Sequence, residues 1–70
     1  MNRLKKLREG RGLKQDDLAI MLGNSVPNYC KKENGIVKFS LDEAKILAEY
    51  FQEPIETIFF NNEVSIIETG

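Results

Sequence analysis

A short segment that begins with Ser25 is flanked by basic side chains, and residues of this kind can bind a polyanion. The segment is the second of two candidate helices, which Gly23 separates. The flanking ammonium groups are those of Lys14, Lys31, Lys32 and Lys38. A helix fits the major groove of DNA, and cationic flanks can then lie near the phosphates. The pattern therefore indicates recognition of a nucleic acid by charge and hydrogen bonds.

Catalytic and metal-binding chemistry find little support in the composition. The 70 residues include no histidine and a single cysteine, Cys30. Histidine is the commonest general base and metal ligand, and one thiolate cannot build a zinc site. Asp16 and Asp17 are adjacent, so on a helix they do not face one another as a carboxylate pair. We expect no enzyme, no cofactor, no metal site and no small-molecule substrate.

The charges are divided unevenly along the chain. Residues 1–40 hold nine basic and four acidic side chains, whereas residues 41–70 hold one basic and seven acidic side chains. A small protein with this dipole would turn its basic end toward a polyanion. A solvated surface of mixed charge is the alternative explanation.

Length and composition indicate one soluble globular domain. The hydrophobic fraction is 41% and the charged fraction is 30%, as in ordinary folded proteins. No apolar run approaches the roughly 18 to 20 residues that span a bilayer. Cys30 cannot form an intrachain disulfide, and no export signal is visible. We expect a cytoplasmic protein that does not contact a membrane.

Apolar spacing and turn residues predict an all-α fold with five helices. The expected helices are Asn2–Glu9, Gln15–Leu22, Ser25–Glu33, a helix from Ser40 to Phe51 and a short helix after Pro54. Ser40 and Glu43 form a capping box. The third helix has either Ser25 or Val26 as its cap, since Pro27 is tolerated only in a first turn.

The end of the chain is less regular. Asn61 and Asn62 break the helical pattern, and Val64–Ile67 is too short to assign as strand or helix. We expect a compact five-helix domain over residues 1–60 and a short C-terminal tail over residues 61–70, which is a candidate dimer contact. The aromatic residues are expected to serve the core or a dimer interface, namely Phe39, Tyr50, Phe51, Phe59 and Phe60.

The order of these motifs resembles the lambda-repressor-like helix-turn-helix family of phage repressors and Cro proteins. The resemblance rests on the run Gln15–Ser25 with Ala19 and Gly23, followed by Glu33-Asn34-Gly35. It extends to Arg8 before Gly12-Leu13, to Ser40-Leu41 and to Pro54–Phe59. It covers Met1 to about Phe60, and implies a helix-turn-helix motif over residues 15–33 with its recognition helix over residues 25–33.

The resemblance also implies roles for individual residues. Gln15 would hold a phosphate oxygen at the start of the first motif helix. Lys31 would donate to guanine O6 and N7, Val26 and Pro27 would contact a thymine methyl, and Asn28 would reach adenine or a phosphate. The full expected DNA-binding set is Gln15, Ser25, Val26, Pro27, Asn28, Lys31, Lys32, Asn34 and Lys38.

Three positions depart from the family pattern, in which they are usually aliphatic or aromatic. They hold Asn24, Tyr29 and Lys32. Tyr29 can pack as a wedge tipped by a hydroxyl, and Lys32 can bury its stem and send its ammonium group to solvent or phosphate. In relatives, the positions of Arg8 and Glu33 form an ion pair between the first helix and the end of the recognition helix, and we expect that pair here.

The expected function is that of a sequence-specific transcriptional regulator, a phage or prophage repressor of Cro size. It would bind double-stranded DNA as a homodimer, paired through the fourth and fifth helices or the tail, at a pseudo-palindromic operator. The alternative is a protein-binding use of the same fold, as an antirepressor or antitoxin, which Lys32 and Pro27 keep open. Oxidation of Cys30, near the expected DNA side, is a further hypothesis.

Overall fold

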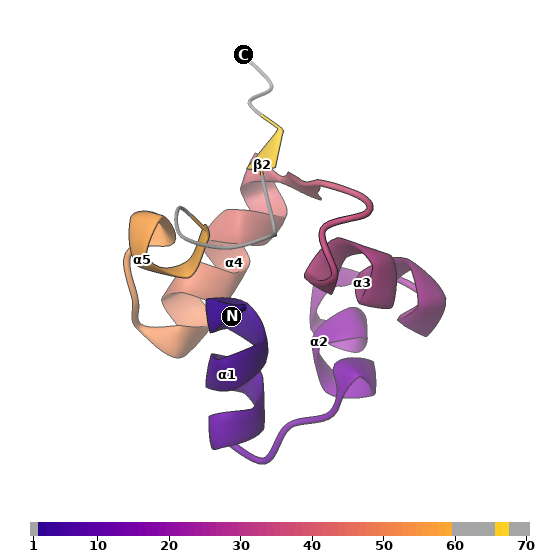
Figure 1. The fold of residues 1–70 in the computed structure, drawn as a ribbon, viewed down its shortest axis with the longest axis horizontal. Coiled ribbons are helices and arrows are strands. Elements are labelled where there is room, and N and C mark those ends of the chain that lie inside the picture. Colours follow the sequence, from indigo (N-terminus) through magenta and orange to yellow (C-terminus); the bar gives the residue numbers. More distant parts are fainter. Residues whose placement is uncertain (1, 60–65, 68–70) are drawn as a thin grey trace.

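The computed structural model of the chain describes residues 2–59 and 66–67. Five helices follow one another as α1 (Arg3–Gly10), α2 (Gln15–Leu22), α3 (Val26–Glu33), α4 (Leu41–Phe51) and α5 (Ile55–Phe59). In Figure 1, α2 and α3 lie together at the right, and α1, α4 and α5 gather to their left. The expected five-helix, all-α class is confirmed. Within the described part of the chain, no helix is long and apolar enough to cross a membrane.

Side-chain caps define where the helices begin. The side-chain oxygen of Asn2 accepts from the backbone N–H of Lys5 at 3.1 Å at the start of α1. The Ser25 hydroxyl accepts from the backbone N–H of Asn28 at 3.3 Å, so Ser25 is the cap of α3 rather than Val26. In the predicted capping box of α4, the Ser40 hydroxyl accepts from Glu43 N–H at 3.1 Å, and a Glu43 oxygen accepts from Ser40 N–H at 2.9 Å. Each cap satisfies a backbone donor that has no partner within its helix.

The helix ends follow the glycines closely. The first helix includes Gly10, one residue beyond the predicted end. Gly23 ends α2 in the left-handed conformation, with φ of 70°. After α3, it is Gly35 that adopts a positive φ, 81°, while Asn34 stays at −86°. The sharp turn between α2 and α3 therefore depends on a residue without a Cβ.

Arg11 closes the end of α4, a role that the sequence did not suggest. Its Nη1 donates to the carbonyl of Tyr50 at 3.1 Å, and its Nη2 donates to the carbonyl of Phe51 at 3.2 Å. The guanidinium also lies over both rings, 5.5 Å from the Tyr50 centroid and 5.1 Å from the Phe51 centroid. A cation here satisfies terminal carbonyls and favours the helix dipole.

Every helix contributes apolar side chains to one core. Phe39 lies among aromatic neighbours, with ring centroids 6.1 Å from Tyr29 and 5.5 Å from Phe59. The buried apolar side chains are those of Leu4, Leu18, Ala19, Tyr29, Phe39, Ala44, Leu47, Phe51, Ile58 and Phe59. The helices α2 and α3 supply only Leu18, Ala19 and Tyr29 to this set. The position of α3 therefore depends on its polar contacts as well as on apolar packing.

Two short strands add a feature that the sequence left unassigned. The strand β1 (Phe39–Ser40) pairs in parallel with β2 (Ile66–Ile67), with Phe39 opposite Ile66 and Ser40 opposite Ile67. This pairing holds part of the predicted tail against the start of α4. Phe60, Asn61, Asn62 and Val64 lie outside the described residues.

Alanine substitutions at Gly10 and Gly23 should change the free energy of unfolding in opposite directions. A Cβ added at Gly23 or at Gly10 would meet no heavy atom within 4 Å, but only Gly23 has a positive φ. We expect Gly23→Ala to lower the free energy of unfolding by about 1–2 kcal/mol, because an L side chain is strained there. Gly10→Ala should raise it by about 0.5–1 kcal/mol, because the unfolded chain loses entropy. Urea denaturation measures both, and equal signs would contradict this account.

Candidate nucleic-acid interface

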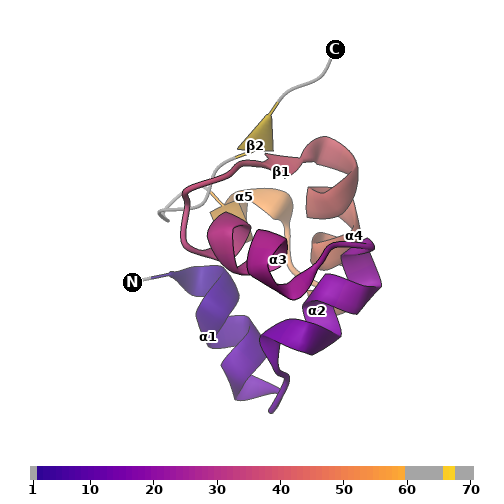
Figure 2. The same ribbon diagram turned by 90° about the vertical axis from the view of Figure 1, so that its right-hand side faces the viewer.

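The third helix has a buried side and an exposed side. Tyr29 and Glu33, four residues apart, are 0% and 1% exposed. The side chains of Ser25, Val26, Pro27, Asn28 and Lys31 are exposed. Figure 2 shows α3 at the front of the molecule, between α1 and α2. The exposed side of α3 is therefore free to enter a groove of DNA.

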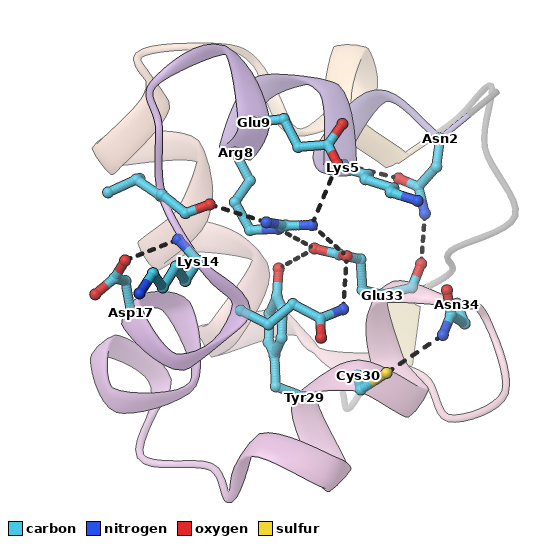
Figure 3. Close-up of polar contacts among 12 residues, drawn as sticks. Asn2, Lys5, Arg8, Glu9, Lys14, Asp17, Tyr29, Cys30, Glu33 and Asn34 are labelled. Atoms are coloured by element: carbon cyan, nitrogen blue, oxygen red, sulfur yellow. Dashed lines mark hydrogen bonds and ion pairs between the residues drawn. The ribbon is translucent and has the colours of Figure 1, made fainter.

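The buried side of α3 is organised by the carboxylate of Glu33. Arg8 donates to it from Nε at 2.9 Å and from Nη2 at 3.1 Å, in a two-pronged ion pair. Gln15 Nε2 donates to Oε1 at 3.1 Å, and the Tyr29 hydroxyl donates to Oε2 at 2.8 Å. Asn2 donates to the Glu33 backbone carbonyl. Figure 3 shows Arg8 and Tyr29 converging on Glu33, so the expected ion pair is present within a larger network.

These contacts decide the charge state of the network. Burial alone would raise the pKa of Glu33, but hydrogen bonds from Arg8, Gln15 and Tyr29 outweigh it, and the pKa is lowered. The hydrogen bond to Glu33 raises the pKa of Arg8 despite burial. Burial and the hydrogen bond to Glu33 raise the pKa of Tyr29 far above its ordinary range. Glu33 and Arg8 are thus charged and Tyr29 is a neutral donor near neutral pH.

Gln15 lies at the start of α2, as the sequence predicts, but its amide has a partner inside the protein. It is half-buried, and one hydrogen of Nε2 is given to Glu33. An amide nitrogen carries two hydrogens, so one hydrogen and the amide oxygen remain. At this helix start, the backbone N–H of Lys14 donates to Asp17 Oδ2 at 2.8 Å, as expected for an acidic residue in a first turn. The phosphate contact of Gln15 stays a prediction.

Three of the lysines in the expected pattern present ammonium groups at the surface. Lys14, Lys31 and Lys38 are exposed, and none of them forms an ion pair with another described residue. Lys31 lies on α3 and Lys38 lies in the segment between α3 and β1. These groups are available to phosphates or base edges.

Lys32 behaves differently from the expectation. Its Nζ lies 2.7 Å from Glu43 Oε2 and 2.9 Å from Oε1, and both side chains are mostly covered, with 12% and 13% exposed. The expectation that Lys32 sends its ammonium group to solvent or phosphate is therefore wrong. An ammonium group that is mostly covered needs a counter-charge, and Glu43, from the capping box of α4, supplies it.

Glu43 is the residue whose wider role sequence reasoning missed. Besides Lys32 and Ser40, it accepts from Asn24 Nδ2 at 2.7 Å. Asn24 Nδ2 also donates to the Leu22 carbonyl at 3.1 Å. The available signal was the pair of polar residues, Asn24 and Lys32, at positions that relatives fill with apolar side chains. Two such residues need polar partners, and Glu43 serves both.

The end of α3 carries the remaining predicted residues. Asn34 is exposed and follows the helix directly, and its Nδ2 lies 3.4 Å from the half-buried Sγ of Cys30. Cys30 has a free thiol. Neither the contact of Asn34 with DNA nor oxidation of Cys30 follows from this geometry, and both stay predictions.

Comparison with known proteins bears on this surface. A family model described as Helix-turn-helix matches residues 4–58. The match runs from α1 into α5 and includes α2, Gly23 and α3. No curated protein matches the chain.

The Glu33 network gives a stability prediction. Replacing Glu33 with Gln removes the buried counter-charge of the Arg8 guanidinium and leaves it with the exposed Glu9 carboxylate at 3.9 Å. We expect Glu33→Gln to lower the free energy of unfolding by about 3–5 kcal/mol at neutral pH. The matched control is Glu49→Gln, which removes an equal charge from an exposed site on α4 and should change it by at most about 0.5 kcal/mol.

The same pair of proteins tests the sign of the pH dependence. A lowered folded-state pKa means that ionised Glu33 stabilises the fold above the unfolded pKa, about 4.3, and that this contribution is lost as the pH falls. The difference in unfolding free energy between the original protein and Glu33→Gln should therefore shrink below about pH 4. Urea denaturation between neutral and acid pH measures it, and a difference that grows toward acid pH would contradict the network.

Proposed function

The chain belongs to the lambda-repressor-like helix-turn-helix family of DNA-binding transcription regulators, and we propose that it is a cytoplasmic phage or prophage repressor of Cro size. It binds a pseudo-palindromic operator as a homodimer. Residues 1–60 form the DNA-binding domain and residues 61–70 form a tail. The observation that carries the proposal is the exposed side of α3, whose opposite side is held by the Glu33 network.

Base recognition falls to the exposed residues of α3. Val26 and Pro27 occupy the first turn, where recognition helices meet base edges, and their apolar surfaces suit a thymine methyl group. Lys31 lies one turn further along and suits guanine O6 and N7. Because Pro27 removes a backbone donor, discrimination leans on apolar contact and on the shape of the DNA.

Phosphate contacts surround this reading surface. Gln15 and Ser25 lie near the starts of α2 and α3, and Asn34 and Lys38 lie beyond the end of α3. Backbone donors at helix starts and exposed cations both suit phosphate oxygens. Lys32 has no place in this set, because its ammonium group is bound to Glu43. The polar residue Lys32 was one of two features that kept the antirepressor or antitoxin alternative open, and its contact with Glu43 gives it a role within the fold.

A homodimer finds support on α4. Ile46 and Tyr50 lie four residues apart and are 41% and 40% exposed, so they form an apolar stripe on one side of the helix. Two copies related by a two-fold axis can bury the same stripe against itself. A dimer that binds two half-sites needs its two α3 helices about one DNA turn apart, roughly 34 Å.

Binding to DNA at several salt concentrations tests the proposed function. Purified protein is titrated with a duplex enriched from a random-sequence library and with a scrambled duplex. We expect the enriched duplex to bind more tightly, and the logarithm of affinity to fall linearly with the logarithm of salt concentration, because phosphate contacts release counterions. An absence of both effects would favour the antirepressor or antitoxin alternative.

Lysine variants distinguish base contacts from phosphate contacts in the same DNA titration. Lys31→Ala should lose about 1–3 kcal/mol on the enriched duplex and relax the preference at one position. Lys38→Ala should weaken all duplexes alike and reduce the salt slope by about 1. Lys45→Ala is the control, since Lys45 is exposed on α4 and lies outside the proposed set. Uniform losses in both Lys31→Ala and Lys38→Ala would contradict the assignment of Lys31 as a base reader.

The dimer contact has its own test. Ile46→Asp places a charge in the proposed interface, so self-association should weaken at least tenfold while the monomer keeps its stability to within about 0.5 kcal/mol. Ile20→Asp is the control, since Ile20 is 78% exposed on α2. Sedimentation equilibrium measures the association. Equal association of both variants would exclude the α4 stripe as the interface.

A further inference from the structure

A chain of amide hydrogen bonds connects α4 to the exposed side of α3. Glu43, at the start of α4, accepts from Asn24 Nδ2 at 2.7 Å. Asn24, in the turn before α3, accepts at Oδ1 from Asn28 Nδ2 at 2.8 Å. Glu43 and Asn24 are half-buried, while Asn28 is exposed among the proposed base readers. This relay runs from the start of α4, through the turn between α2 and α3, to the exposed side of α3.

The charge of Glu43 gives the relay its direction. An ionised carboxylate only accepts hydrogen bonds, so Asn24 must turn its nitrogen toward Glu43. The oxygen of Asn24 then faces Asn28, which must in turn present its own nitrogen to it. The relay uses one hydrogen of Asn28 Nδ2, which leaves the other hydrogen and Oδ1 for a partner outside it.

Lys32 keeps this direction fixed. Burial alone would raise the pKa of Glu43, but hydrogen bonds from Lys32, Ser40 and Asn24 outweigh it, and the pKa is lowered. The Lys32 ammonium group contacts both carboxylate oxygens. Glu43 consequently stays an acceptor at neutral pH and does not offer a proton to Asn24.

The outward groups of Asn28 match a single base. Adenine offers a donor at N6 beside an acceptor at N7 in the major groove, which complements one amide oxygen and one amide hydrogen side by side. Guanine offers two acceptors, thymine an acceptor and a methyl group, and cytosine a donor alone. A freely rotating amide would not impose this choice as strongly, because it could also turn its nitrogen outward.

We propose that Asn24 and Glu43 are positioning residues that fix the amide of Asn28 for the recognition of adenine. The proposal rests on the proposed function, since it requires α3 to lie in the major groove. It gives Asn24 and Lys32, the polar departures from the family pattern, a joint purpose. Neither Asn24 nor Glu43 needs to touch DNA for this effect.

In vitro selection from a random-sequence duplex library tests the proposal. The original protein should enrich adenine at one position in each half-site by about tenfold or more over the other bases. Asn28→Ala should lose that preference. Asn24→Leu should lose most of it at the same position, while the preferences at other positions persist. Leucine resembles the aliphatic residue usual at this position, so the fold should survive, and thermal unfolding confirms that it does.

A second variant guards against a purely structural effect. Glu43→Gln keeps the shape of the side chain but can face Asn24 with either amide atom, so the adenine preference should fall by several-fold. Because the change also removes the counter-charge of Lys32, selection is run below the unfolding temperature that thermal unfolding gives for this variant. Glu49→Gln, an equal change of charge on the same helix, should leave it unaltered. Lower salt strengthens binding through phosphate contacts. It should not restore the adenine preference of Asn24→Leu or of Glu43→Gln.

The outcomes are distinct. Retention of the adenine preference by folded Asn24→Leu, or enrichment of another base at the position that Asn28→Ala affects, overturns the relay and leaves the regulator intact. A lack of any enriched sequence with the original protein overturns both the relay and the proposed function.

Discussion

The buried carboxylate of Glu33 is the point at which three helices of this protein meet. Arg8 comes to it from α1, Gln15 from α2 and Tyr29 from α3 itself. Taking a charge out of water is costly, so such a group stabilises a fold only when its partners are complete. Among the described residues, no buried side-chain nitrogen or oxygen lacks a hydrogen bond. The network therefore fixes the position of α3 relative to α1 and α2 more than it adds net stability.

A second carboxylate, that of Glu43, does the same toward α4. It accepts from Lys32 of α3 and from Asn24 of the turn before α3, and it also accepts from the backbone N–H of Ser40 in the capping box of α4. The α3 helix is thus held at both flanks by ionic hydrogen bonds whose geometry is directional, whereas apolar packing alone tolerates small shifts. Residues that read bases need such support, because a displacement of about 1 Å already weakens a designed site.

The features that were predicted correctly depend either on neighbouring residues in the sequence or on the resemblance to the family. The bounds of α2, the cap at Ser25 and the capping box of α4 follow from neighbours within four residues, and the pair of Arg8 and Glu33 followed from the resemblance. The partners of Lys32 and Arg11 did not, because they depend on how α3 and the turn after α1 meet α4. Periodicity tells which side of a helix is covered but not what covers it. The charge count likewise does not reveal that Arg8, Arg11 and Lys32 are engaged within the fold.

This internal use of cations bears on how the protein can discriminate among DNA sequences. Salt-dependent, sequence-independent affinity scales with the number of phosphates that lysine and arginine neutralise. With Arg8, Arg11 and Lys32 engaged within the fold, the exposed lysines of the proposed DNA-binding surface are Lys14, Lys31 and Lys38. Under the proposed function, engaging Arg8, Arg11 and Lys32 within the fold limits the sequence-independent part of binding and increases the share that base contacts must supply. In the proposed regulator, positive charge that holds α3 in place is withheld from phosphates, which lowers the affinity for every wrong site and so contributes to specificity.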